Sequence, residues 1–400
     1  MKPKISFKGF KEPWEVSTLR NFFSKVNEKN VRMLYSAVLT NSAEYGIIDQ
    51  RDYFDFDVAN SNNISGYYIV QPDDFVYNPR VSVTAPVGPI NKNELGYIGV
   101  MSPLYLVFKI NGINKDYLCH YFKSNKWHKF MRISGNCGAR FDRLSISDEQ
   151  FVQMPIPYPI NSKEQQTICN YLEKIDKLIS TASSRLASLK QVKEASLQAM
   201  FPQKGETVPK IRFKGFEGEW VITKAAEIFK TVNERNFSGL PVLSATQDKG
   251  MVTRDSIGYN IFHDKSNEST YKHILPGQFV MHLRSFQGGF AHSAIEGICS
   301  PAYTIMEFKD KEKNHDLYWK YVLASKRFIK SLEMITYGIR DGRTISFDEF
   351  KEMVFLVPKV EEQQRIASYF TSLDKQIALQ TQRLEKLKQI KAACLDKMFV

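Results

Sequence analysis

The chain has 400 residues and a mass of 46.2 kDa, which predicts two or more globular domains. Hydrophobic residues make up 43% and aromatic residues 13% of it, which excludes a mainly disordered protein. The 55 Lys and Arg against 43 Asp and Glu leave a net charge of +12. This charge favours a polyanionic partner, with nucleic acid ahead of an acidic membrane surface. A solvated basic surface without a partner explains the charge equally well.

Neither a membrane segment nor a disulfide framework is expected. No stretch approaches the ~18–20 uncharged apolar residues of a membrane helix, and residues 1–15 lack the apolar core of a secretory signal. The five cysteines are scattered and form neither a CxxC pair nor a Cys/His ligand spacing. We therefore expect a cytoplasmic protein with buried, reduced thiols and no metal site.

The sequence repeats itself. Residues 3–30 return at 209–236 with 13 identities in 28 positions, and residues 164–201 align without gaps on 362–399 with 18 identities in 38. Two matches of this length predict a tandem duplication. Each copy is then a variable domain on a shared scaffold, closed by a similar C-terminal segment.

The two variable domains have mixed α/β patterns. Aromatic and β-branched runs bounded by turn residues predict strands at 67–70, 104–108, 272–275 and 303–306. Helical spacing appears over 116–131 and 316–332, with Asp116 and Asp316 near the helix N-termini.

The C-terminal segment of each copy predicts a long helix with the a/d seam of a coiled coil. The seam residues are Leu172, Ile175, Ile179, Leu186 and Leu189 in the first copy, and Phe370, Leu373, Ile377, Leu384 and Leu387 in the second. About 38 residues make a rod of roughly 55 Å, and one such helix cannot bury its apolar stripe alone. We expect the two helices to pack on each other; the alternative is that each lies flat on its own domain.

No catalytic constellation is present in the sequence. There is no GxxxxGK[ST] phosphate loop and no GxGxxG fingerprint. Asn78-Pro79 resembles the start of the Asn-Pro-Pro-aromatic motif of amino-methyltransferases, but Arg80 follows it. We therefore expect no catalytic residue and no cofactor in this chain.

Basic residues beside strand ends, glycines and aromatics indicate DNA binding instead. They are Arg80, Arg132, Arg140 and Arg143 in the first copy, and His282, Arg284, Arg340 and Arg343 in the second. Arginine can lie bidentate on guanine or clamp phosphates. Any one of them is also explained as a solvated or ion-paired surface residue, but their recurrence at matched places favours the group.

An ordered set of motifs, present twice, resembles the specificity (S) subunit of type I restriction-modification systems over essentially the whole chain. The motifs are the Phe-Lys-Gly-Phe…Trp openings (7–14, 213–220), the proline lead-ins (155–157, 357–358), Glu-Gln-Gln (164–166, 362–364) and the closing Met-Phe (200–201, 398–399). No single motif is specific, but the repeated set is.

The resemblance implies an α+β fold with two similar mixed α/β target-recognition domains in tandem, at 1–161 and 205–359. Each is followed by a long helix, at 162–204 and 360–400, and the two helices pack as an antiparallel coiled coil with pseudo-two-fold symmetry. Each domain would read one half of a split DNA target, and the helices would set the spacer between the halves.

The resemblance also implies partners. Adenine methylation from S-adenosylmethionine would belong to two modification (M) subunits, and ATP- and Mg-dependent cleavage to two restriction (R) subunits. A partner that fuses methylation and cleavage is equally compatible with the sequence. The competing function is a two-headed coiled-coil scaffold that binds protein or RNA.

Overall fold

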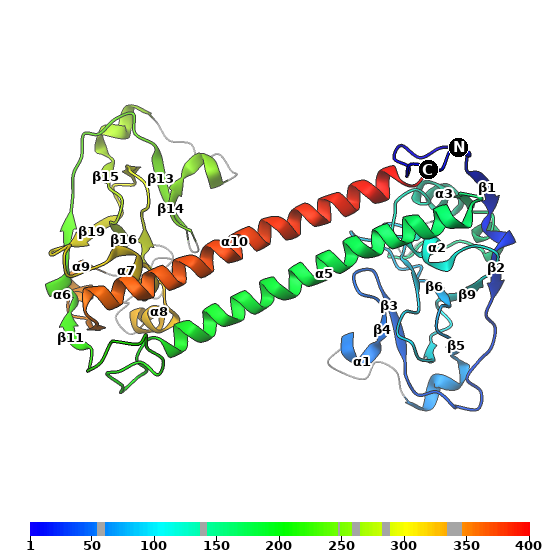
Figure 1. Cartoon of the computed structure of the whole chain (residues 1–400), viewed down its shortest axis with the longest axis horizontal. Helices are drawn as coiled ribbons and strands as arrows, with labels where there is room; N and C mark the ends of the chain where they lie inside the picture. The colour runs from blue at the N-terminus through cyan, green and yellow to red at the C-terminus, as the bar shows by residue number, and fades with distance from the viewer. Residues whose placement is uncertain (54–60, 137–141, 247–248, 258–264, 282–288, 334–345) are drawn as a thin grey trace. The chain divides into compact units, whose positions relative to one another are not determined.

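The computed structural model of the chain describes residues 1–400 except 54–60, 137–141, 247–248, 258–264, 282–288 and 334–345. The chain forms two compact units: unit 1 consists of Met1–Ser184 and Gln382–Val400, and unit 2 of Arg185–Thr381. Unit 1 is therefore built from both ends of the chain, and Figure 1 shows the N- and C-termini close together in it.

Unit 1 is built on a four-stranded antiparallel sheet in the order β2-β9-β6-β7, with three smaller strand pairs, β1–β10, β3–β4 and β5–β8. The strands are β1 (Glu15–Thr18), β2 (Phe23–Lys25), β3 (Leu39–Ser42), β4 (Gly46–Asp49), β5 (Tyr68–Val70), β6 (Phe75–Tyr77), β7 (Ile90–Lys92), β8 (Gly99–Met101), β9 (Leu106–Ile110) and β10 (Pro155–Tyr158). Its shorter helices are α1 (Gln50–Tyr53), α2 (Lys115–Phe122), α3 (His128–Ser134) and α4 (Asp148–Phe151), with 3-10 helices at Leu19–Asn21 and Ser61–Gly66.

Unit 2 repeats this arrangement with sheets ordered β12-β19-β16-β17 and β14-β13-β18-β15 and the strand pair β11–β20. The strands are β11 (Val221–Lys224), β12 (Phe229–Val232), β13 (Val242–Thr246), β14 (Gly250–Thr253), β15 (Lys272–Ile274), β16 (Phe279–Met281), β17 (Ala291–His292), β18 (Gly297–Cys299), β19 (Thr304–Phe308) and β20 (Val354–Val357). The shorter helices are α6 (Ala225–Ile228), α7 (Asp316–Leu323), α8 (Lys326–Glu333) and α9 (Phe347–Phe350), with 3-10 helices at Arg254–Ile257 and Lys265–Thr270.

Strands β6 and β16, each an inner strand of a four-stranded sheet, are buried on both faces. In β6, Phe75 and Tyr77 point into a large aromatic core, whereas Val76 lies in a second, aliphatic core. In β16, Phe279 and Val280 divide between two cores in the same way. Alternating side chains of a strand point to opposite faces, so continuous apolar runs are required here.

The predicted strands are found within two residues of their expected positions, as β5, β9, β15 and β19. Each predicted helical stretch is two helices, α2 and α3 in unit 1 and α7 and α8 in unit 2. A serine ends the first helix of each pair: the hydroxyl of Ser124 donates to Tyr121 O (2.6 Å), and that of Ser325 to Val322 O (2.8 Å). The serine side chain thereby competes with the next turn of the helix.

Two 38-residue helices, α5 (Ser162–Ala199) and α10 (Val360–Lys397), follow the variable domains and pack against each other in antiparallel directions. Within unit 2, Lys193 Nζ lies 2.5 Å from Asp374 Oδ1, and within unit 1, Lys391 forms the equivalent ion pair with Asp176. Of the ten seam positions, five are buried and five half-buried. The buried ones are Leu172, Ile175, Phe370, Leu373 and Leu384; the half-buried ones are Ile179, Leu186, Leu189, Ile377 and Leu387.

The Glu-Gln-Gln motif joins the base of each long helix to its domain. Gln165 accepts from the amide of Asn114 (3.1 Å) and donates to Pro159 O (2.8 Å). Gln363 accepts from the amide of His315 (2.9 Å) and donates to Pro358 O (3.0 Å). One buried amide side chain therefore connects the strand that precedes the long helix to the N-terminus of α2 or α7.

Candidate nucleic-acid interface

Arg80 and Arg143, which are 63 positions apart in the sequence, face each other across an isolated antiparallel bridge in unit 1. The amide of Val81 donates to Asp142 O and that of Leu144 to Pro79 O, each over 2.9 Å. Opposed residues of an antiparallel pair place their side chains on the same face. The fold therefore brings together two of the arginines predicted to bind DNA.

Two like charges at directly opposed positions repel each other. Arg80 is exposed and Arg143 half-buried, and neither forms a salt bridge with an acidic residue in the described part of the chain. A phosphate or the acceptor edge of a base placed over this pair would relieve the repulsion and accept charge-assisted hydrogen bonds.

Arg132 lies on the exposed side of α3. After Gly135, the chain continues into Asn136, whose backbone pairs with that of Ser145 (2.8 and 2.9 Å), two residues beyond Arg143. Gly135 permits this approach, because a Cβ there would lie 2.8 Å from both Leu144 Cγ and Met131 O. Burial, followed by the charge of Arg132, lowers the pKa of His128, so this histidine stays neutral and adds no positive charge at neutral pH.

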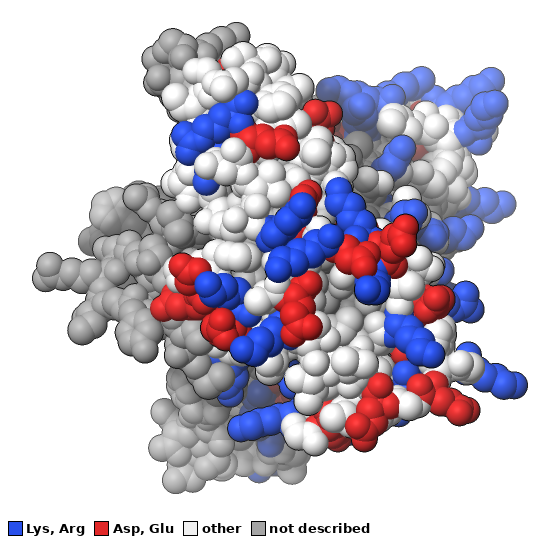
Figure 2. Space-filling model, turned by 90° about the vertical axis from the view of Figure 1, so that its left-hand side faces the viewer, with Lys and Arg blue, Asp and Glu red and all other residues white. Residues whose placement is uncertain are grey.

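The other basic residues singled out in the sequence, Arg140, His282, Arg284, Arg340 and Arg343, lie outside the described residues. On the side of the molecule shown in Figure 2, lysines and arginines are interspersed with acidic side chains and do not form one continuous basic surface. The opposed pair of Arg80 and Arg143 is therefore a more specific indication of a DNA contact than the net charge of the chain.

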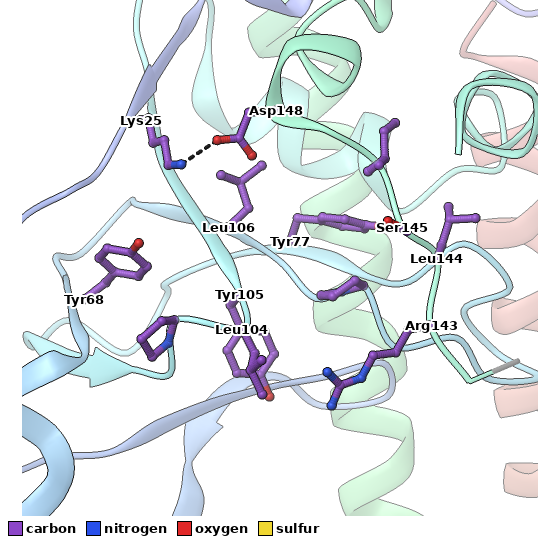
Figure 3. A pocket seen from close by; sticks show the side chains of 13 residues that line it. Lys25, Tyr68, Tyr77, Leu104, Tyr105, Leu106, Arg143, Leu144, Ser145 and Asp148 are labelled. Atoms are coloured by element: carbon purple, nitrogen blue, oxygen red, sulfur yellow. Dashed lines mark hydrogen bonds and ion pairs between the residues drawn. The ribbon is translucent and has the colours of Figure 1, made fainter. Parts of the chain in front are cut away.

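A cavity of about 340 Å³ opens beside Arg143 in unit 1 (Figure 3). It is lined by Lys25, Tyr68, Tyr77, Pro79, Pro103, Leu104, Tyr105, Leu106, Arg143, Leu144, Ser145, Ile146 and Asp148. Figure 3 shows the guanidinium of Arg143 directed toward the side that carries Leu104 and Tyr105. Lys25 and Asp148 form an ion pair on another side, and this hydrogen bond raises the pKa of Lys25.

Sequence reasoning missed most of this cavity, including Lys25, Tyr68 and Leu104. These residues come from β2, β5 and the turn before β9, and no local motif joins them. A comparison of the two copies could have found them, because they lie on matched segments but differ between the copies. For example, Leu104 corresponds to Ala302 within the runs Ser-Pro-Leu-Tyr and Ser-Pro-Ala-Tyr.

In unit 2, the buried side chain of His273 forms hydrogen bonds with two acidic side chains. Its ring lies between Glu234 (Nδ1 to Oε2, 3.0 Å) and Glu296 (Nε2 to Oε1, 2.9 Å), and Phe237 stacks on it with ring centroids 3.8 Å apart. Carboxylates only accept hydrogen bonds, so both bonds together require the doubly protonated imidazolium.

Within the described residues, no group of three His, Cys, Asp or Glu side chains could hold a metal ion, and no helix there is long and apolar enough to cross a membrane. Four cysteines, Cys119, Cys169, Cys299 and Cys394, are buried and unpaired, as expected, whereas Cys137 lies outside the described residues.

Comparison with known proteins identifies the family. The sequence profile described as "Type I restriction modification DNA specificity domain" matches residues 11–191 and again residues 217–389. A search of curated protein sequences finds no match for the chain.

Two solved structures share the fold. The crystal structure of a type I restriction-modification system S subunit from M. genitalium has a TM-score of 0.61 at 12% identity, and the alignment covers 100% of this chain and 99% of the other. A chain from work on the structural basis of complex assembly and conformational transition of the type I R-M system has a TM-score of 0.51 at 14% identity, with 97% and 98% coverage.

The chain belongs to the type I restriction-modification DNA specificity family, as a DNA specificity subunit and not an enzyme. A subunit of this family acts on DNA together with the other subunits of its restriction-modification system. The resemblance inferred from the repeated motifs is thereby confirmed, and so is the tandem α+β fold with two long packed helices.

Proposed function

We propose that each unit reads one half of a bipartite DNA target and that α5 and α10 set the number of base pairs between the halves. Residues 1–161 and 205–359 are then the two target-recognition domains, and residues 162–204 and 360–400 the two arms. The duplication carries this proposal: the same contacts join helix to domain in both units, for example through Gln165 and Gln363, while the variable domains differ.

The basic residues serve as DNA contacts in this proposal. Arg80, Arg132 and Arg143 do so in unit 1, where the opposed, unneutralised pair of Arg80 and Arg143 supports the assignment. Arg140 in unit 1 and His282, Arg284, Arg340 and Arg343 in unit 2 are assigned from the sequence alone.

The proposed assembly rests on the family resemblance together with the two-unit design. Two modification subunits would methylate adenine from S-adenosylmethionine, one beside each half-site, and two restriction subunits would cleave with ATP and Mg. The complex would act in the cytoplasm, and this chain would contribute recognition and spacing.

The spacing role is tested by inserting four residues after Ser184 in α5 and four after Thr381 in α10, which are the boundaries between the units. Four residues add about one helical turn and about 6 Å, so the apolar stripe is nearly preserved. Because base pairs rise ~3.4 Å, the spacer should lengthen by about one or two base pairs while both half-sites stay unchanged. Long-read methylome sequencing of a host that expresses the chain with its partner subunits measures both quantities.

Changed half-site bases with an unchanged spacer would contradict the proposal.

A second measurement distinguishes the proposed function from that of a scaffold that binds protein or RNA. The purified complex with the modification subunits should bind double-stranded DNA with a steep dependence on salt and a large preference for its target over random DNA.

A further inference from the structure

The cavity beside Arg143 combines a constant frame with variable walls. Strand registers and the shared Ser-Pro-x-Tyr run align the two units position by position. Two lining residues, Pro103/Pro301 and Tyr105/Tyr303, are identical in both units. So are the core and strand residues Phe75/Phe279, Val76/Val280, Gly99/Gly297 and Phe151/Phe350. The lining residues that differ include Lys25/Thr231, Tyr68/Lys272, Tyr77/Met281, Leu104/Ala302, Leu106/Thr304 and Asp148/Phe347.

The constant positions include one that sterically fixes the frame. A Cβ on Gly99 would lie 2.5 Å from Leu39 Cγ, and a Cβ on Gly297 would lie 2.7 Å from Leu243 Cγ. Both glycines let strand β8 or β18 approach its neighbouring strand closely. The strand that pairs with Tyr68 or Lys272 is thus held close to its neighbour in both units. The side chains that line the cavity are exchanged, which is the arrangement expected of a specificity-determining site.

The walls of the cavity in unit 1 suit a planar ligand with an acceptor edge. Tyr68 and Tyr105 supply aromatic surface, and Leu104 is 61% exposed at the rim. Asp148 neutralises Lys25, so Arg143 is the lining cation without an acidic partner among the described residues. At about 340 Å³, the cavity is at the small end of the range for ligand sites.

We propose that this cavity takes one base of the half-site read by unit 1, with Arg143 donating to the acceptor atoms on the edge of the base and Leu104, Tyr68 and Tyr105 forming the wall against it. Guanine offers the O6 and N7 acceptors that arginine binds bidentately, so guanine is the expected base. The inference rests on the proposed function and adds the residues that select one base.

The same place in unit 2 has a different surface. Lys272 replaces Tyr68, and its Nζ donates to the carbonyl of Tyr303 over 2.6 Å. Burial, followed by the charge of Arg235, lowers the pKa of Lys272. Thr231 and Phe347 replace the ion pair of Lys25 and Asp148, so both members of the pair have been exchanged together. Two copies of one frame therefore present different walls, and each selects a different base.

The test uses the full chain with its modification subunits in a methylome experiment. Arg143→Ala should lower the preference for guanine at one position of one half-site by about 5- to 150-fold, the range of one bidentate arginine contact. The double variant Tyr68→Lys/Leu104→Ala transplants two wall residues of unit 2 and should change the preferred base at the same position. The other half-site and the spacer should stay unchanged in both variants.

Val16→Lys is the matched control, because Val16 is also exposed (48%) but lies on β1, away from the cavity. The complex that contains this variant should methylate the wild-type motif. If the complexes with both cavity variants also methylate only that motif, the cavity proposal is wrong while the proposed function stands. A wild-type chain that directs no bipartite motif overturns the proposed function and the cavity proposal with it.

Discussion

The matched buried tryptophan and glutamate have different hydrogen-bond partners in the two units. In unit 1, Trp14 Nε1 donates to Glu164 (3.1 Å). In unit 2, Glu362 instead accepts two hydrogen bonds from Arg212 (2.7 and 2.8 Å), and the indole N–H of Trp220 has no partner among the described residues. Between two copies of one domain, the hydrogen-bond donor to a buried carboxylate can therefore differ, provided that the carboxylate keeps at least one donor.

The packing under α7 and α8 differs as well. Unit 2 contains a cavity of about 730 Å³ whose lining includes Val322 and Ser331. With Ser124 and Ser325 as the matched helix ends, the corresponding residues of unit 1 are the larger Tyr121, which is buried, and Phe130. The comparison shows that the contacts at the base of the long helix are held constant, whereas the volume of the domain core is not.

The largest effect should come from removing the new partner of the buried carboxylate. Arg212→Ala leaves Glu362, whose side chain is 2% exposed, without its ion pair and should destabilise unit 2 by about 3–5 kcal/mol. Urea unfolding followed by tryptophan fluorescence measures the loss. The matched position of unit 1 is Ser6, so Ser6→Ala should have almost no effect. An unchanged free energy of unfolding for Arg212→Ala would show that Trp220 replaces the arginine at no cost.

The difference in core volume predicts the next effect. Tyr121→Val opens in unit 1 the space that Val322 leaves in unit 2, and should cost about 2–4 kcal/mol, including the loss of its hydrogen bond to Pro155 O. The reverse change, Val322→Tyr with Ser331→Phe, fills the cavity of unit 2 and should stabilise it by about 1 kcal/mol. Thermal unfolding of both variants measures whether each change raises or lowers stability. A loss of stability in both variants would mean that the two cores are not interchangeable.

The loss of a tyrosine hydroxyl is expected to have a smaller effect on stability. Tyr117 Oη donates to Pro157 O (2.8 Å), whereas the hydroxyl of its counterpart Tyr318 is buried without a partner in the part of the chain that the structure describes. Tyr117→Phe should cost about 1 kcal/mol, while Tyr318→Phe should be neutral or stabilising. Equal losses at the two positions, measured by urea unfolding, would contradict this difference between the units.

The smallest effect concerns pH. Burial lowers the pKa of His273, but the hydrogen bonds to Glu234 and Glu296 outweigh it, so the pKa is raised above its ordinary value of ~6.5. The stabilisation of unit 2 is therefore complete below pH ~6.5 and is lost as the pH rises through the higher folded pKa. Replacing His273 with isoleucine, the residue at the matched position 69, should remove this dependence. A wild-type chain whose unit 2 is equally stable at pH 6 and pH 8.5 would refute the role of the imidazolium.

The sequence was sufficient for the parts of the fold that depend on local periodicity. The seam from Leu172 to Leu189 predicted α5 because a helix repeats every 3.6 residues, and the repeated Glu-Gln-Gln motif marked its beginning. The role of Gln165 could not be predicted, because its partner Asn114 is 51 positions away. Arg80 and Arg143 were selected as separate residues, and only the folded strand pairing places them opposite each other.

The central claim is that two copies of one frame each read their own half-site. It is tested most directly by replacing residues 15–158, from β1 to β10, with a second copy of residues 221–357, from β11 to β20, and sequencing the methylome of a host that carries this chain and its partner subunits. The account predicts that the asymmetric target becomes an inverted repeat of the unit 2 half-site with its spacer unchanged. Persistence of the original asymmetric motif would contradict it.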